Sequence, residues 1–539
     1  MNDRVSVSAT SDQTVGTVPS RLMPAWITTG TAQTFRRFWA ATVLILLLGA
    51  GLRLIGLFDD FWLDEIWSWL FAREMKSAGA VFYKIHHDNN HYLNTLWMYV
   101  VGVQPHWYVY RLHSFASGLL TIIGCGLLTG DVAFSSIQQS LNATNLRKKT
   151  STEQSAEASR VEAGQFARAA SLVAMLLLAT CNFASIYSTE ARGYAMAGAA
   201  AVFSTWVLRL IVIDAKSRVV RFPLILVYVG LVTIGFLSHL TFICVYLPQL
   251  IWSTYQFLVH RCFLPAFACH PPVFLLIAGL WLFDLQYAQV GGANTQSPFW
   301  IGFESLALPF GAIDPEWLVL LCAGVIAGML VFGIQFLFRM KSPDASLFAL
   351  LFLCSPPLIL LMRSDGLIST RHFFVVWMTL FPVLAIAVTQ LATREKGKLP
   401  VLPLIILIGW MTTNGWEIYR FAQNGRGGFQ RSAEWLVAEA LKKQDGRTGP
   451  QSVGSDHDFR NQLTLSFYMR KIPNFEILGY LPQGSWPPNG VDWLFTHSFD
   501  RNFQPEPTIN IGTWRYELAH FEPYSGVVGW HWAIYRRAE

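Results

Sequence analysis

Long apolar stretches, separated by short polar segments, dominate the first 413 residues of the chain. A bilayer core requires about 20 apolar residues per helix. Windows of this kind predict spanning helices at 38–57, 111–134, 168–187, 194–213, 222–240, 241–258, 263–283, 316–338, 346–362, 372–392 and 399–413. One further stretch, 92–103, is apolar but too short to span comfortably. We therefore expect a polytopic α-helical membrane protein with about eleven to thirteen transmembrane helices.

Composition and charge agree with this interpretation. The chain has 53% hydrophobic and 14% charged residues, whereas ordinary soluble domains carry about 25% charged residues. Its basic residues concentrate in alternate loops, near 138–168, 214–221, 339–341 and 394–398. Because cytoplasmic loops are enriched in Lys and Arg, the formal net charge of +6 requires no nucleic-acid partner. We expect residues 1–37 to form a disordered cytoplasmic tail and residues 38–413 to form the transmembrane domain.

The remaining residues, 414–539, change character. The segment "RSAEWLVAEALKK" (431–443) has helical spacing, with acids early and lysines late. Short β-prone runs follow it, namely "QSVGS", "NFEILGY", "VDWLFTHS" and "WHWAIYRR", and they are separated by turns rich in Gly and Pro. This pattern predicts a small α/β domain outside the membrane, on the side opposite the basic loops.

The first outer loop, about 58–92, begins with "FDDFWLDEIWSW". Aromatic rings are typical of the membrane–water boundary, but carboxylates placed there need a purpose. We interpret Asp59 and Asp60 as structural or solvated loop acids. Asp64 and Glu65, which lie among the aromatic residues, are stronger functional candidates.

Other polar groups fall on the same predicted side of the membrane, in "KIHHDNNH", "STEARGY", "SHLT" and "RSDGLISTRHF". A charge at membrane depth costs roughly 2.5–3.5 kcal/mol, so charges gathered at helix ends indicate a shared polar chamber. Carboxylates can act as general bases, and Arg, Lys and His suit a phosphate. This combination favours sugar transfer from a lipid phosphate.

Simpler interpretations stand beside these. Glu190 and Arg192 could merely pair at a helix end, and His239 alone is typical of a hydrogen-bonded histidine at a helix terminus. The histidines at 86, 87 and 91, together with Asp88, could suggest a metal, but no HExxH or similar spacing occurs. We therefore predict no cofactor, and a divalent metal is not indicated.

These motifs together resemble the GT-C class of integral-membrane glycosyltransferases. The likeness is greatest to the branch that contains the protein O-mannosyltransferases and the lipid A aminoarabinose transferase. An acidic pair opens the first outer loop of that family, and "YSTEARGYAM" (187–196) matches its "Y-S-x-E-A-R-x-Y" element closely. "RLHSFASGLL" (111–120) precedes this match, as the family's "R-L-x-S" element does, and "SHLT" and "TRHFFVV" come after it in the family's order. The double proline of the family's "H-P-P-L-Y" stretch is absent from "NNHYLNTLW".

The resemblance implies roles for individual residues. Asp64 would be the base that takes the proton from an acceptor hydroxyl, and Glu65 would hold the acceptor or orient the base. Several other residues would shape the donor and phosphate pocket: Lys84, His91, Glu190, Arg192, Arg363 and Arg371. Asp88, Asn94 and His239 are additional candidates. The resemblance also implies inverting displacement from a polyprenyl-phosphate-linked sugar.

The outward-facing polar groups are compatible with two classes of function, a glycosyltransferase and a transporter. A glycosyltransferase would act at the outer face of a bacterial inner membrane, with the N-terminus cytoplasmic and residues 414–539 periplasmic or extracellular. Its acceptor would be a lipid, a glycan or a protein. A transporter or flippase of lipid-linked saccharides is the alternative. A transporter should show repeated halves and polar residues at the membrane midplane, whereas these halves do not repeat.

Overall fold

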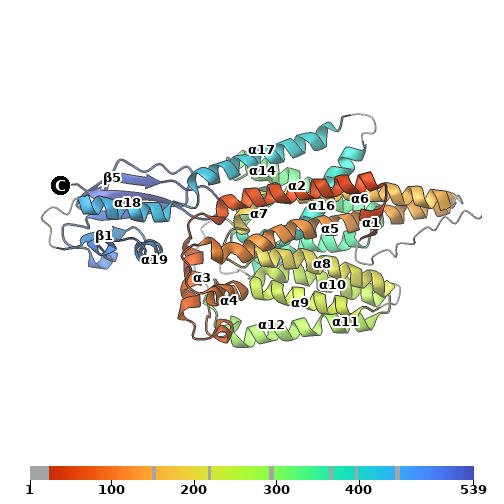
Figure 1. The fold of residues 1–539 in the computed structure, drawn as a ribbon, viewed down its shortest axis with the longest axis horizontal. Helices are drawn as coiled ribbons and strands as arrows, with labels where there is room; N and C mark the ends of the chain where they lie inside the picture. Colours follow the sequence, from red (N-terminus) through yellow and green to blue (C-terminus); the bar gives the residue numbers. More distant parts are fainter. Residues whose placement is uncertain are drawn as a thin grey trace, which may run out of the picture.

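The computed structural model describes residues 24–148, 153–216, 220–289, 297–362, 368–394, 399–442 and 449–538. Long helices run roughly side by side in one elongated bundle, and a small domain containing a sheet stands at one end of it (Figure 1). The predicted fold class, a polytopic helical protein with a small C-terminal α/β domain, is confirmed.

Each predicted window overlaps a helix of the bundle. The helices are α2 (Ala32–Leu57), α5 (Tyr108–Lys148), α6 (Glu153–Thr180), α8 (Tyr194–Lys216), α9 (Phe222–Ser238), α10 (Ile243–Val259), α11 (Phe263–Cys269), α12 (Pro271–Phe283), α14 (Glu316–Arg339), α15 (Asp344–Met362), α16 (Phe374–Arg394) and α17 (Val401–Asn424). Among the described residues, 10 helical segments are long and apolar enough to cross a membrane, and Phe222–Ser238 is a shorter apolar helix. The helices α11 and α12 share one of these segments.

The centre of the bundle is α16. All of its residues from Phe374 to Thr389 are buried, because its sequence is apolar on every face and it packs against α5, α6, α8 and α14. The residues just before α16 form a short 3₁₀ turn, η5 (Thr370–Phe373), at the end of the bundle nearest the small domain.

Short helices cover this same end of the bundle. The first outer loop folds into α3 (Leu63–Glu74), η1 (Ala78–Phe82) and α4 (Tyr92–Val101) (Figure 1). With 10 residues, α4 is too short to cross a bilayer. A second short helix, α7 (Asn182–Tyr187), separates α6 from the loop that leads to α8, so the predicted span 168–187 is two helices.

The predicted disordered tail is wrong for its second half. Residues 1–23 lie outside the described residues, but α1 (Ala25–Thr28) is folded and α2 begins at Ala32. Trp26 is 1% exposed, and its indole N–H donates to Asp131 Oδ1 at 2.8 Å. Arg168 Nη1 donates to the carbonyl of Trp26 at 2.7 Å. A buried indole with these contacts anchors the segment to the bundle.

The C-terminal domain contains a six-stranded mixed sheet in the order β2-β1-β3-β6-β5-β4. Its strands are β1 (Gln451–Ser455), β2 (Leu478–Tyr480), β3 (Trp493–Ser498), β4 (Thr508–Ile511), β5 (Trp514–Glu522) and β6 (His531–Arg537). Two helices pack on each other and on the sheet, α18 (Phe429–Lys442) and α19 (Asp458–Met469). The four β-prone runs coincide with β1, β2, β3 and β6, whereas the pattern did not predict β4, β5 or α19.

The helix α17 extends beyond the predicted boundary at 414, and the domains meet at the segment Gly425–Gly428, which we call the glycine joint. Its three glycines have φ of 58°, 133° and 53°, values that favour glycine. The fourth residue, Arg426, is fully buried: its Nη1 lies 2.9 Å from Asp59 Oδ2, and its Nη2 donates to the carbonyl of Thr189 at 3.3 Å. One arginine thus joins the C-terminal domain to two loops of the bundle.

A second set of contacts fixes the C-terminal domain on the first outer loop. The Gln430 backbone N–H donates to Asp60 Oδ2 at 2.8 Å, and the Tyr468 hydroxyl donates to the carbonyl of Phe61 at 2.7 Å. The Phe467 ring lies 4.9 Å from the Trp107 ring, centroid to centroid. The acid at position 60 is therefore part of a domain interface.

This interface predicts a pH dependence. Burial, with the charge of Asp59 adding to it, raises the pKa of Asp60 from 3.8 to about 7. The folded state then holds this proton more tightly than the unfolded state. Asp60 therefore contributes stability below its unfolded pKa of 3.8, and this is lost as the pH rises toward about 7. We expect Asp60→Asn to become more stable than wild type across this window.

The measurement is the melting temperature of the full chain in detergent, wild type against Asp60→Asn, at a series of pH values. The difference between the two proteins should grow with pH and level off above about 7. A difference that stays constant over the whole series would show that Asp60 does not titrate at the interface.

Candidate active site

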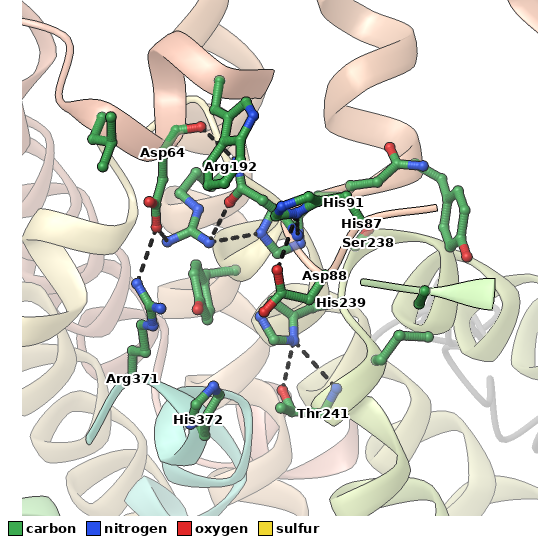
Figure 2. Close-up of a pocket in the computed structure, with 18 of the residues that line it drawn as sticks. Asp64, His87, Asp88, His91, Arg192, Ser238, His239, Thr241, Arg371 and His372 are labelled. Atoms are coloured by element: carbon green, nitrogen blue, oxygen red, sulfur yellow. Dashed lines mark hydrogen bonds and ion pairs between the residues drawn. The ribbon is translucent and has the colours of Figure 1, made fainter. Parts of the chain in front are cut away.

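A cavity of about 760 Å³ opens where the bundle, the first outer loop and the C-terminal domain meet. Its walls combine charged side chains with apolar and aromatic ones. Ionisable residues from segments far apart in the sequence line it, among them Asp64 from α3, Asp88 and His91 from the loop before α4, Arg192 from the loop before α8, and Arg371 from η5 (Figure 2). The shared polar chamber expected from the sequence is therefore present at this end of the bundle.

Asp64 bridges two arginines. Its Oδ2 lies 2.8 Å from Arg192 Nη1 and 3.0 Å from Arg371 Nη1 (Figure 2). The position of the carboxylate follows from its place in the first turn of α3, where an acid is favoured by the helix dipole. Its side chain keeps 14% exposure and faces the cavity, so it is accessible to a ligand.

Arg192 is held from several directions. Its Nη2 donates to Asn89 Oδ1 at 2.9 Å and lies 3.0 Å from His91 Nε2. Its guanidinium also lies over the rings of Trp62 and Tyr194, at 5.5 Å and 4.9 Å. Planar contacts of this kind fix the orientation of the guanidinium and its hydrogen-bond donors.

Two histidines continue the wall beyond Arg192. The rings of His91 and His239 stack with centroids 4.8 Å apart, and His239 Nδ1 lies 2.8 Å from the Thr241 hydroxyl (Figure 2). Burial and then the charge of Arg192 hold the pKa of His91 well below its usual value. His91 is therefore a neutral imidazole near neutral pH. It can accept a hydrogen bond from Arg192 but adds no positive charge to the cavity.

Glu65 lies outside the cavity wall, although it follows Asp64 directly. Arg111 donates to it twice, from Nε to Oε1 at 2.8 Å and from Nη2 to Oε2 at 2.6 Å, and both side chains are fully buried. The Ala191 backbone N–H also donates to Oε1, at 2.6 Å. Burial would raise the pKa of Glu65, but the charge and hydrogen bonds of Arg111 outweigh it and lower the pKa. These contacts indicate a structural role for Glu65, whereas the role that the resemblance implies, holding the acceptor or orienting the base, stays a prediction.

Glu190 points toward the glycine joint. Its Oε1 lies 4.0 Å from Arg426 Nε, and the side chain is fully buried. Burial raises its pKa to about 7, against the opposing charges of Arg426 and Arg192. Its ion-pair partner is therefore Arg426 and not Arg192, with which it could have paired at the helix end.

The remaining predicted residues divide clearly. Lys84 is exposed and Asn94 is buried within α4, and neither lines the cavity. Asp88 and His239 do line it. Arg363 lies outside the described residues.

Several cavity residues were not found by sequence reasoning. The C-terminal domain contributes His457, Phe459, Arg460, Phe499 and Trp530 to the wall. No motif or spacing marks these residues, because their proximity to Asp64 depends on how the domain docks. Within the described segments, no group of three or more His, Cys, Asp or Glu side chains is arranged to hold a metal ion.

The chain is similar in structure to oligosaccharyltransferases of Archaeoglobus fulgidus. One, in complex with Zn and sulfate, matches with 10% identity and a TM-score of 0.44, over 85% of this chain and 67% of that chain. Another, AglB in complex with an inhibitory peptide and a dolichol-phosphate, matches with 10% identity and a TM-score of 0.45, over 86% of this chain and 70% of that chain. No protein-family model and no curated protein matches the sequence. Because identity and TM-score are low, the function has to be inferred from this chain's own residues.

Proposed function

We propose that the chain is a glycosyltransferase that moves a sugar from a polyprenyl-phosphate-linked donor to an acceptor hydroxyl. The observation that carries this proposal is the bridge from Asp64 to Arg192 and Arg371 inside the cavity. It places one accessible carboxylate beside two guanidinium groups, at the end of a bundle of membrane-spanning helices. A base and a phosphate-binding pair are the groups that this transfer needs.

The cavity also suits a lipid-linked donor. Apolar side chains from the bundle line it beside the arginines, among them Phe236, Leu240 and Ile359. A polyprenyl chain would lie against these residues with its phosphate on Arg192 and Arg371. The lipid remains in the membrane, and the sugar projects into the cavity.

The chemistry follows from this placement. The acceptor oxygen forms a bond to the anomeric carbon while the bond from that carbon to the phosphate oxygen breaks, which inverts the configuration. Asp64 takes the proton of the acceptor hydroxyl. The polyprenyl phosphate leaves with the electron pair and is stabilised by Arg371 and Arg192. Asp64 pairs with both arginines, so a donor phosphate that takes over these contacts would release its carboxylate for the acceptor.

Orientation follows from the same proposal. The cavity would open on the outer face of a bacterial inner membrane, with the C-terminal domain on that side. The sugar and the acceptor would be identified by mass spectrometry of lipids and glycans from a strain that lacks the gene. We expect one sugar to disappear from one envelope component and to return on complementation with wild type but not with Arg371→Gln.

Purified protein separates transfer from transport. Incubated in detergent with the lipid-linked sugar and the acceptor identified in that strain, an enzyme releases free polyprenyl phosphate and glycosylates the acceptor. A transporter leaves the lipid-linked sugar intact. Recovery of only the intact donor would overturn the proposal and favour the alternative of a flippase.

A further inference from the structure

The wall of the cavity that faces the bundle belongs to the C-terminal domain. Phe459 and Arg460 from the first turn of α19 line it, together with Phe499 and Trp530. This wall lines the same cavity as Asp64, Arg192 and Arg371, and it carries one arginine among aromatic rings.

Arg460 is held in place while most of its donors stay available. Its Nη1 lies 3.1 Å from His497 Nε2, and His497 Nδ1 lies 2.9 Å from Asp456 Oδ1. The carboxylate fixes the proton on Nδ1, so Nε2 accepts from Arg460. Within the described part of the chain, this is the one hydrogen bond that the guanidinium makes. The Phe499 ring supports its face at 4.9 Å.

Aromatic rings from the two domains meet beside this arginine. The Trp67 ring lies 5.1 Å from the Phe459 ring and 4.2 Å from the His87 ring, and all three residues line the cavity. Aromatic faces with adjacent polar groups are suited to the apolar faces of a sugar ring. The Arg460 guanidinium suits a carboxylate or a phosphate, which it can bind with two parallel hydrogen bonds.

Electrostatics connect this wall to the proposed base. Burial lowers the pKa of Arg460, whereas the charges of Asp456 and Asp64 raise it. Asp64 and Arg460 line the same cavity, and the charge of Asp64 favours the charged form of Arg460. If the donor phosphate occupies Arg192 and Arg371, an inverting attack must come from the side of the sugar that faces away from them. In this proposal the acceptor approaches along the wall formed by the C-terminal domain, which lines the same cavity.

We propose that Arg460, with Trp67 and Phe459, forms the acceptor subsite, and that the acceptor is a saccharide bearing a carboxylate or a phosphate. The sugar ring lies against the aromatic side chains, and the acidic group pairs with Arg460. This inference rests on the proposed function for the direction of attack. The subsite itself is defined by the cavity and can be tested by binding alone.

The test follows the tryptophan fluorescence of the full chain in detergent during titration with four probes: D-glucuronate, D-glucose 6-phosphate, D-glucose and inorganic phosphate. We expect at least one of the two acidic sugars to bind about tenfold more tightly than glucose. Comparing the affinities of glucuronate and glucose 6-phosphate shows whether the site prefers a carboxylate or a phosphate. Arg460→Gln should remove this advantage, and Arg460→Lys should keep part of it. The matched control is Arg515→Gln, a change at an exposed arginine of the same domain, and it should bind like wild type.

Three results would overturn the subsite: equal affinity for acidic and neutral sugars, unchanged binding by Arg460→Gln, or inorganic phosphate binding as tightly as glucose 6-phosphate. The last result would indicate an ion site without sugar recognition. Melting temperatures confirm that the variants are folded. Asp64→Asn should still bind the acidic sugar although it transfers nothing. If the wild-type protein binds the acidic sugar through Arg460 but shows no transferase activity, the proposed function is refuted and the subsite stands.

Discussion

We expect Asp64→Asn to abolish sugar transfer while the protein still folds and inserts into the membrane. The amide keeps the shape of the side chain but cannot take the acceptor proton, and loss of a general base lowers a rate by roughly 10²–10⁴-fold. The fold tolerates the change because the carboxylate faces the cavity and is 14% exposed. Arg192 also keeps its contact with Asn89, which holds it in position without Asp64.

The assay compares purified wild type, Asp64→Asn and Glu74→Gln at equal folded concentration, with release of polyprenyl phosphate as the readout. Glu74 is the matched control because it is an exposed acid at the other end of α3. Glu74→Gln should keep full activity. Full activity in Asp64→Asn would remove Asp64 from the mechanism, whatever else the cavity does.

Replacing the next acid, Glu65, by its amide should affect stability and not the chemical step. Glu65→Gln lowers the stability of the protein by about 3–5 kcal/mol, because it leaves the buried Arg111 without its counter-charge. Both side chains are fully buried, so water cannot compensate for the loss. Arg111 also donates to the carbonyls of Gly56 and Leu57, at 3.2 Å each, so its displacement disturbs the start of the first outer loop.

The measurement is thermal unfolding in detergent, with Asp64→Asn and Glu74→Gln as comparisons. We expect a clear drop in melting temperature and poor recovery of folded protein for Glu65→Gln alone. Normal stability combined with lost transfer would return Glu65 to the reaction and contradict the role inferred from its contacts.

The spanning helices were predicted well because each apolar window is long enough to be identified without knowledge of its neighbours. The errors arose where tertiary contacts decide the outcome. Trp26 lies in a polar, Ser/Thr-rich segment, yet its burial against Asp131 folds the end of the tail. The boundary at 414 is wrong because α17 continues to Asn424, and hydrophobicity does not determine where a helix ends beyond the bilayer.

In the candidate site, too, the local sequence predicted some residues correctly, whereas tertiary contacts decided the others. Sorting polar residues by membrane side grouped Asp64 with Arg192 and Arg371, and the structure brings these three together. It could not separate Asp64 from Glu65, because the partner of Glu65 is Arg111, 46 residues further along the chain. Arg460 could not be predicted either, since its place in the same cavity as Asp64 depends on how the C-terminal domain docks.

The glycine joint has a consequence for how this chain is organised. Arg426 belongs by sequence to the connection with the C-terminal domain, yet its side chain pairs with Asp59 of the first outer loop. Its own carbonyl accepts the backbone N–H of Trp530 at 3.3 Å, so one residue is shared by both halves. The transmembrane part and the C-terminal domain are therefore structurally interdependent. Neither could be exchanged between proteins as an independent module, and the connection between them is not a flexible linker.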